Sequence, residues 1–461
     1  MATISTIPDD AHFPQSQVIT NKLAMKEIFQ QRLPGFAEGR LQIEALDLLH
    51  FHYKPGARCE VCYALQVKEL ATGRAGSQIL SGVVKPNGAA ETKYAKAQLE
   101  AHFQPEFGPA IHFFSDLKMI LWGFPNDARL KQLPQLLDHR RRLEIFRSAW
   151  PPLAGLCGAL QFPLEIKLAE ATAKLIKYAP ADRCTLRHDL RLSNDNTLTI
   201  YSKTFSHKTD GAQIFKTMQV LWNALALDHA GTIMIPEPLF FVPDLNTLFV
   251  SGLEGENLDE HLAAIDLNKI AATIGAGLAR LQQCRLEELS LDSDQDMLSE
   301  VAEVAETLEN HYAAISAVVK ILREKYSTLT PITPAPIHGA FRLSQLLLVN
   351  GKLALIDFDD FRCGNPLVDV GSFVAHLLYL PLREKLTMEQ SRTAIRHFCR
   401  AYAEAAPWGL PADVLAWQTA AHLIGQQAKK CITLAKKNHP VKVSSLIDCA
   451  NAILAGQDRL I

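Results

Sequence analysis

The sequence predicts an α+β fold in which a sheet-rich N-terminal part precedes a mainly helical C-terminal part. A strand–turn–strand unit occurs twice before residue 210, and apolar residues recur at spacings of three and four after residue 258. Alternation with a period of two is typical of strands, and the longer spacing is typical of helices. Between the helical segments, residues 337–359 combine a polar loop with an apolar strand, which marks the candidate functional site.

Composition limits the classes of protein that this chain fits. It has 461 residues, 48% apolar residues and a formal net charge of −2. The length suits two or three domains, and the charge gives no basic field for a nucleic-acid polymer. The first thirty residues lack the basic start and apolar core of a secretory signal. The apolar run at residues 373–382 is too short to cross a membrane. Because the nine cysteines are scattered, we expect a reducing, cytoplasmic location.

One supersecondary unit occurs twice in the sequence. Residues 53–59 and 178–184 share the pattern Tyr-x-Pro-x-x-Arg-Cys, and each copy lies between two strand-like runs. Each copy then reaches a further strand that ends at a lysine, Lys85 or Lys203, before a Gly-Ala pair and a helical segment. This order predicts a β-hairpin and a third strand, used twice.

The domain boundaries follow from this repeat. We expect an N-terminal α+β module over residues 1–150, which repeats the hairpin unit of a second small lobe over residues 151–252. A mainly helical lobe would then occupy residues 253–461, with helical segments at 258–284 and 297–325.

The most informative motifs lie in the third segment. Residues 337–345 read Ile-His-Gly-Ala-Phe-Arg-Leu-Ser-Gln, and residues 355–359 read Leu-Ile-Asp-Phe-Asp. Together with Lys203 and Asp369, this series resembles the aminoglycoside phosphotransferase and choline kinase family, a branch of the protein-kinase-like superfamily. The resemblance covers about residues 173–380 and implies a bilobal kinase-like fold, to which the repeated unit would add an extra N-terminal module. That family has His-Gly-Asp, then four intervening residues, then Asn; Ala340 and Gln345 stand at the Asp and Asn positions here.

The resemblance implies roles in binding Mg²⁺ and ATP. Lys203 would contact the nucleotide phosphates, and Arg183 could replace the amides of a glycine-rich cover, because guanidinium groups suit phosphate. Backbone groups near Val250 and Leu253 would hold the adenine. Asp357 would bind the metal ion, joined by the amide oxygen of Gln345. The alternatives are a surface turn residue for Arg183 and a solvated strand-end lysine for Lys203. The helix expected at residues 212–226 contains no acid to pair with Lys203.

Three further residues complete the predicted catalytic set. His338 would support the loop, and Arg342 would face the substrate or a phosphate. Strand alternation would place Asp359 on the same side as Asp357, as a second metal ligand or a substitute base. A solvated or capping carboxylate is the alternative for Asp359. In the C-terminal part, Lys429-Lys430 and Lys436-Lys437 form either a solvated helix face or a site for an acidic ligand.

These residues leave three functions open. The first is an ATP-dependent phosphotransferase of the aminoglycoside, choline or maltose kinase type, acting on a hydroxyl group of a small molecule. The second is a pseudokinase that binds nucleotide and serves as a regulatory or scaffold protein, with a protein partner. The third is transfer of another part of ATP, such as the nucleotidyl group. Ala340 has no group that can accept a proton, and general-base assistance is worth about 10²–10⁴-fold in rate.

Overall fold

The computed structural model describes residues 12–54, 56–86, 88–150, 153, 155, 167–227, 233–286, 295–309, 312–433, 439–458 and 460. The chain divides into two compact units. Unit 1 comprises Met1–Ala212, Leu239–Val250 and Ile432–Lys437, and unit 2 comprises Gln213–Pro238, Ser251–Cys431 and Asn438–Ile461. Among the described residues, no helix combines the length and the apolar character needed to cross a membrane.

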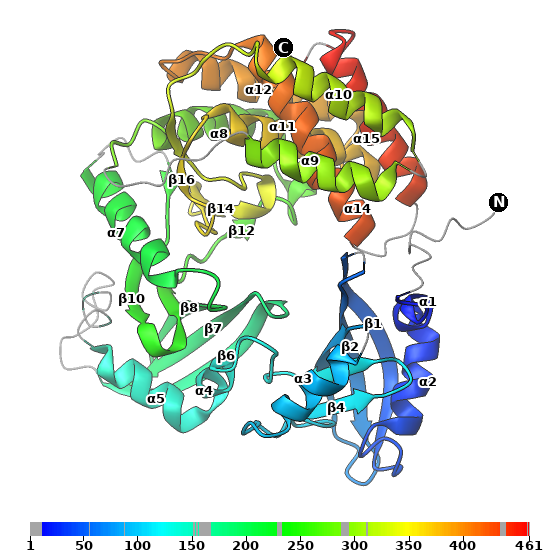
Figure 1. The fold of residues 1–461 in the computed structure, drawn as a ribbon. Coiled ribbons are helices and arrows are strands. Elements are labelled where there is room, and N and C mark those ends of the chain that lie inside the picture. Colours follow the sequence, from blue (N-terminus) through cyan, green and yellow to red (C-terminus); the bar gives the residue numbers. More distant parts are fainter. Residues whose placement is uncertain are drawn as a thin grey trace. The chain divides into compact units, whose positions relative to one another are not determined.

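Unit 1 contains two five-stranded sheets with the same strand order (Figure 1). The first sheet has the order β1 (Leu41–Lys54), β2 (Arg58–Glu69), β3 (Ala75–Val84), β5 (Met119–Gly123) and β4 (Ile111–Phe114). The second has the order β6 (Leu168–Ala179), β7 (Arg183–Leu192), β8 (Thr197–Phe205), β11 (Thr247–Ser251) and β10 (Pro238–Val242). A helix follows the third strand of each sheet, α3 (Ala89–Ala97) or α7 (Gly211–Leu227). The repeat read from the sequence therefore corresponds to an entire sheet and not to a hairpin alone.

The two hairpin turns adopt the same backbone conformation with different residues. Gly56 in the first turn and Ala181 in the second occupy equivalent positions and both have φ of 60°. This left-handed conformation costs an alanine about 1–2 kcal/mol. The second turn is held by Asp127, whose Oδ2 accepts hydrogen bonds from the Ala181 amide at 2.9 Å and the Tyr178 hydroxyl at 2.5 Å. Asp127 follows β5 of the first sheet, so its side chain connects the two repeats within unit 1.

Separate apolar cores support the two sheets. The first core packs the alternating residues of β1 and β2 against α2 (Lys22–Arg32), with Phe29 and Tyr63 in edge-to-face contact at 5.2 Å. The second core packs β6, β7 and β8 against α4 (Leu133–Leu137) and α5 (His139–Ser148). Phe146 of α5 packs against His188 and Phe249 of the second sheet, with ring centroids 5.1 and 5.6 Å away.

Unit 2 consists of helices packed beside short strands. Its helices include α8 (Leu267–Leu281), α9 (Gln295–Leu308), α10 (Ala314–Tyr326), α11 (Leu367–Tyr379), α12 (Met388–Ala405), α13 (Ala412–His422), α14 (Lys429–Thr433) and α15 (His439–Leu454). Every residue of α11 is buried, as its nearly continuous apolar sequence requires. At Gly371 of α11, a Cβ atom would lie 2.5 Å from Cβ of Gln418, so the glycine permits close contact with α13.

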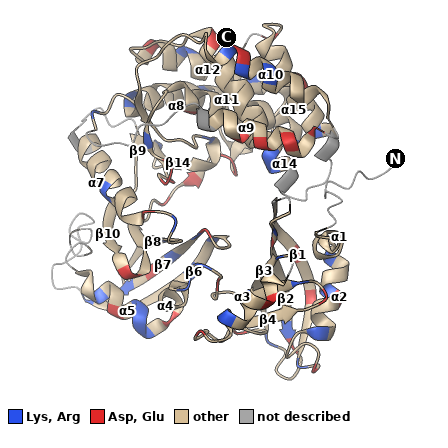
Figure 2. Ribbon diagram, in the orientation of Figure 1, with Lys and Arg blue, Asp and Glu red and all other residues tan. Residues whose placement is uncertain are grey.

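The strands of unit 2 form two small sheets. One has the order β12 (Glu256–Asn257), β14 (Leu346–Val349), β15 (Lys352–Leu355) and β9 (Ile233–Met234). The other pairs β13 (Ala335–Ile337) with β16 (Arg362–Gly364). Lys and Arg are interspersed with Asp and Glu over the elements of the chain (Figure 2).

Two predicted helical segments are wrong in extent. Residues 258–266 precede α8, which begins after Asp266 because this side chain caps the helix by accepting from the Lys269 amide at 3.3 Å. Residues 297–325 do not form one helix, since α9 ends at Leu308 and α10 begins at Ala314. Apolar periodicity continues across both interruptions, which is why spacing alone did not reveal them.

Candidate functional site

Strand pairing in unit 2 brings the two sequence motifs together. β13 leads directly into His338, and its pairing with β16 places Ile337 opposite Arg362. The hairpin of β14 and β15 joins the end of the first motif to the start of the second, with Leu346 opposite Leu355. The Ile356 amide also donates to the carbonyl of Gln345 at 3.0 Å. Residues up to eleven positions apart in the sequence are therefore neighbours in the site.

A buried carboxylate holds the first motif in place. Asp369, in the first turn of α11, is fully buried and accepts hydrogen bonds from the amides of His338 at 2.7 Å and Gly339 at 2.9 Å. Burial raises the pKa of Asp369, while the neighbouring His338 and these donors oppose that rise. Hydrogen bonds donated to a carboxylate favour its ionised form. These contacts tie the first motif to the start of α11.

The third donor to Asp369 was not found from the sequence. Gln282, the residue after α8, donates from Nε2 to Oδ2 of Asp369 at 3.1 Å and to the Pro366 carbonyl at 2.9 Å. Tyr402 of α12 donates its hydroxyl to Oε1 of Gln282 at 2.7 Å, and Trp408 Nε1 donates to the Tyr402 oxygen at 2.8 Å. This connected series fixes the loop relative to two helices. No local pattern marks Gln282, because its partners lie 87 and 120 residues away.

His338 has the contacts of a residue that supports the loop. Its side chain is fully buried, and Nε2 lies 3.0 Å from the carbonyl of Ile356 in the second motif. Burial lowers the pKa of His338, although Asp369 and Asp357 counteract this. A neutral imidazole donating to a buried carbonyl suits a structural role better than acid–base chemistry.

Gln345 and Asp357 lie side by side. The Gln345 Nε2 donates to Oδ2 of Asp357 at 2.8 Å. Asp357 has φ of 76°, a conformation that costs a non-glycine residue about 1–3 kcal/mol and persists where the surroundings impose it. Among the described residues, no group of three His, Cys, Asp or Glu has the arrangement to hold a metal ion. One carboxylate and one amide oxygen nevertheless suit Mg²⁺, which takes its remaining ligands from water and substrate phosphates.

The strand-alternation basis for Asp359 is wrong. β15 ends at Leu355, before Asp357, and the left-handed backbone at Asp357 breaks the period of two. Asp359 is half-buried and Asp360 is exposed. The placement of Asp359 on the same side as Asp357 therefore cannot be inferred from strand geometry, and its assignment as metal ligand or base stays a prediction.

Gly339, which precedes the position expected to carry a catalytic Asp, has no room for a side chain. Gly339 has φ of 80°, and a Cβ there would meet the Asp360 carbonyl oxygen at 2.6 Å. Ala340 follows, half-buried, with a methyl group that neither accepts nor donates a proton. Arg342, two residues further, is also half-buried and donates from Nε to Oγ of Ser344 at 3.0 Å.

The residues predicted to bind nucleotide are divided between the two units. Lys203 lies on β8 opposite Thr185 of β7, and Arg183 begins β7 with its Nε 3.5 Å from Oδ2 of its neighbour Asp182. These two residues and Val250 belong to unit 1, while Leu253 and Asp357 belong to unit 2. The convergence of Lys203 and Asp357 on one nucleotide stays a prediction.

Comparison with known proteins finds a family model that matches part of the chain. Residues 197–408 match the model of the phosphotransferase enzyme family (APH), which confirms the resemblance drawn from the motifs. The matched segment contains Lys203, both loop motifs and Asp369, and it excludes the first sheet. The described residues form an α+β fold. No curated protein matches the chain.

Solved structures similar to this chain include kinases of small molecules. A choline/ethanolamine kinase family protein from Mesorhizobium loti is 14% identical, with a TM-score of 0.42, over 61% of this chain and 88% of that protein. A mutant aminoglycoside phosphotransferase, APH(4)-Ia, with ADP and hygromycin B is 14% identical, with a TM-score of 0.42. The match covers 65% of this chain and 97% of that protein. A glucosamine kinase with glucosamine, ADP and inorganic phosphate is 16% identical, with a TM-score of 0.43. The match covers 63% of this chain and 82% of that protein.

Proposed function

We propose that the protein is an ATP-dependent phosphotransferase that acts on a hydroxyl group of a small molecule. The observation that carries this proposal is the pairing of Gln345 with Asp357 at 2.8 Å, beside a loop held by Asp369, inside the segment that matches the phosphotransferase family. The buried hydrogen bonds to Asp369 give this loop a fixed shape, and preorganised positioning is the main contribution of a protein to phosphoryl transfer.

Asp357 and Gln345 would hold Mg²⁺ through side-chain oxygens. When bound, the ion would neutralise charge on the ATP phosphates. In unit 1, Lys203 would supply a cation to the same phosphates and Arg183 a second one, while backbone near Val250 and Leu253 would hold the adenine. His338, neutral and buried, would keep the second motif beside the first through its contact with Ile356.

The hydroxyl of the acceptor would lose its proton without help from Ala340. A loose transition state requires little assistance from a base, so transfer at a reduced rate is consistent with an alanine here. Asp359 is the carboxylate nearest in sequence to the metal-binding Asp357, and we propose it as the substitute proton acceptor, with Arg342 facing the acceptor or the transferred phosphoryl group.

One observation favours a pseudokinase as the second candidate. The amide of Gln345 satisfies Oδ2 of Asp357 by direct donation, so the carboxylate has a partner without a metal ion. Together with Ala340, this contact suits a pseudokinase that binds nucleotide without transferring a phosphoryl group and acts as a regulatory or scaffold protein with a protein partner.

Two measurements test the proposal. Calorimetric titration with Mg·ATP is expected to show binding that Asp357→Ala removes, whereas Asp448→Ala, at an exposed position of α15, leaves it unchanged. Phosphoryl transfer from labelled ATP is then measured across neutral, anionic and cationic hydroxyl compounds. Binding without transfer to any of them would favour the pseudokinase, and unchanged Mg·ATP affinity in Asp357→Ala would contradict the metal-binding role.

A further inference from the structure

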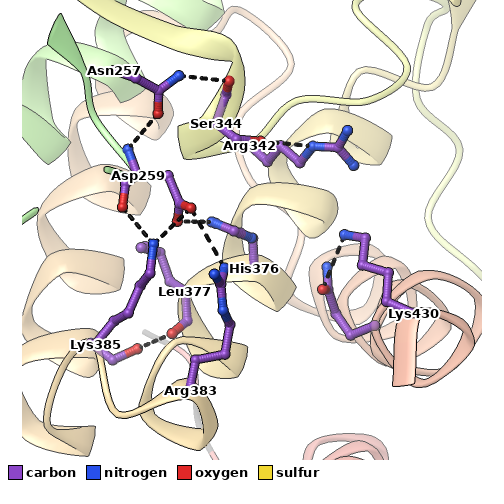
Figure 3. Close-up of polar contacts among 11 residues, drawn as sticks. Asn257, Asp259, Arg342, Ser344, His376, Leu377, Arg383, Lys385 and Lys430 are labelled. Atoms are coloured by element: carbon purple, nitrogen blue, oxygen red, sulfur yellow. Dashed lines mark hydrogen bonds and ion pairs between the residues drawn. The ribbon is translucent and has the colours of Figure 1, made fainter. Parts of the chain in front are cut away.

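Buried polar side chains of unit 2 differ in how far along the sequence their partners lie. Lys430 of α14 is half-buried and donates from Nζ to Oε1 of Gln427, three residues away, at 3.2 Å (Figure 3). A solvated helix face, one of the two interpretations of the basic residues in this region, is therefore wrong for Lys430; Lys436 and Lys437 lie outside the described residues. Gln282 instead joins groups that lie 84, 87 and 120 residues away.

Gln282 belongs to a series of hydrogen bonds that begins in the loop after α12 and ends at the first motif. Trp408, half-buried in that loop, donates from Nε1 to the Tyr402 oxygen at 2.8 Å. Tyr402 donates to Oε1 of Gln282 at 2.7 Å, and Nε2 of Gln282 donates to Oδ2 of Asp369 at 3.1 Å. Asp369 in turn accepts from two backbone amides of the first motif. These four side chains, the Trp408–Asp369 series, therefore connect the end of α12 to the first motif.

The hydrogen bonds of the Trp408–Asp369 series have one possible direction. The indole N–H of Trp408 can only donate, and the carbonyl of Pro366, 2.9 Å from Nε2 of Gln282, can only accept. These two groups make Tyr402 the donor to Gln282, and they turn the N–H group of the Gln282 amide toward Asp369. Among the described residues, the groups hydrogen-bonded to Asp369 are all donors. Such partners suit a carboxylate and leave the O–H of a carboxylic acid without an acceptor.

Gln282 and Tyr402 act on the first motif through Asp369. The two residues are 1% and 0% exposed, so a bound substrate cannot reach them. Burial raises the pKa of Asp369, while the neighbouring His338, the two loop amides and Gln282 oppose that rise. Ala340 directly follows these two amides, so a displacement of Asp369 would displace the loop. In a reaction that depends on fixed positions, a shift of about 1 Å can cost about 10²-fold in rate.

We propose that Gln282 and Tyr402 are positioning residues of the phosphotransferase site, which hold Asp369 as an ionised acceptor in the one orientation that fixes the first motif. Their role in transfer rests on the proposed function, whereas their hold on the loop does not depend on it. The hold weakens along the series from Gln282 to Tyr402 to Trp408, because Gln282 contacts Asp369 directly and Tyr402 can still donate when Trp408 is replaced.

Hydrogen–deuterium exchange of the His338 and Gly339 amides in Gln282→Glu tests this hold without nucleotide. The substitution keeps the size of the side chain and replaces Nε2 by an oxygen. Two carboxyl groups in contact share one proton at neutral pH, so the protonated new group would donate to Asp369 in place of the amide. Burial lowers the pKa of His338 and raises that of Tyr402, so both neighbours stay neutral from pH 7 to pH 9. Loss of the shared proton should lower amide protection, relative to the wild type at the same pH, by about tenfold between pH 7 and pH 9.

Gln283→Glu is the matched control. Gln283 is exposed, and its amide donates to the carbonyls of Ala279 and Ala405, away from Asp369. This control should show no change of loop protection with pH relative to the wild type. Tyr402→Phe adds no charge and should lower the protection about fivefold at both pH values, and Trp408→Phe should lower it less than about twofold. Equal protection in the two Glu variants at both pH values, or wild-type protection in Tyr402→Phe, would overturn the proposal.

Transfer assays separate this inference from the proposed function. With Mg·ATP and a hydroxyl acceptor, kcat of Gln282→Glu should fall relative to the wild type between pH 7 and pH 9, in parallel with the loss of amide protection. KM for ATP should change less than about twofold, because the buried Gln282 does not contact nucleotide. An unchanged kcat in a variant that has lost loop protection would overturn the positioning role and leave the phosphotransferase intact. Loss of protection in Gln282→Glu, without transfer by the wild type to any acceptor, would support the hold on the loop and count against the phosphotransferase.

Discussion

Replacing Asp369 by alanine removes the acceptor that holds the first motif. Three donors would lose their partner at a fully buried site, namely the amides of His338 and Gly339 and the Nε2 of Gln282. Leaving a buried donor unsatisfied costs about 1–3 kcal/mol. Part of this loss is offset, because burial disfavours the Asp369 carboxylate itself and raises its pKa. Loss of one partner from a buried charged network typically costs about 3–5 kcal/mol, and we expect a value in this range.

Thermal unfolding followed by circular dichroism measures this effect. For a domain of 150–250 residues, 1 kcal/mol corresponds to about 2–4 °C in Tm, so Asp369→Ala should lower the transition of unit 2 by roughly 6–20 °C. Gln282→Ala removes one of the three donors and should lower Tm by a smaller amount. Asp448→Ala, at an exposed position of α15, is the matched control and should change the free energy of unfolding by less than about 0.5 kcal/mol. A Tm for Asp369→Ala within about 2 °C of that control would refute this account of the loop.

Three further predictions concern substitutions in unit 2. Ala340→Asp should raise phosphoryl transfer about 10²–10⁴-fold if the loop lacks only a base; an unchanged rate in a labelled-ATP assay would mean that another group has taken over the proton. Gly339→Ala should destabilise by about 2–4 kcal/mol, since left-handed strain adds to a clash with the Asp360 carbonyl. Gly351→Ala, with φ of 77° and open space around its Cβ position, should show the strain alone, about 1 kcal/mol, in urea denaturation. Asp259 forms ion pairs with Lys385 at 2.8 Å and Arg383 at 3.5 Å (Figure 3), so Asp259→Asn should destabilise by about 2–4 kcal/mol at pH 7. Because the folded pKa of Asp259 is lowered, that loss should shrink as pH falls below about 4, and a constant difference from pH 7 to pH 3 would contradict the ion-pair assignment.

Local spacing in the sequence was sufficient for much of the fold. Alternating residues and Pro-containing turns predicted both hairpins, because a strand that is buried on one face must alternate. The shared order of strands, lysine and helix pointed to the repeat, and the motifs around His338 and Asp357 indicated the kinase-like family. These features depend on neighbours a few residues apart, so the chain encodes them directly.

Contacts between residues far apart in the sequence determined how the side chains of the site are arranged, which local patterns did not reveal. Gln282 donates to Asp369 from 87 residues away, and Tyr402 donates to Gln282 from 120 residues away. The conformation of Asp357 also depends on its surroundings, since φ of 76° is unfavourable for an isolated Asp and invalidated the alternation assumed for Asp359. The sequence alone determined which chemical groups are available, whereas packing determined which of them meet, because burial and hydrogen bonding compensate for strain and charge repulsion only in the folded chain.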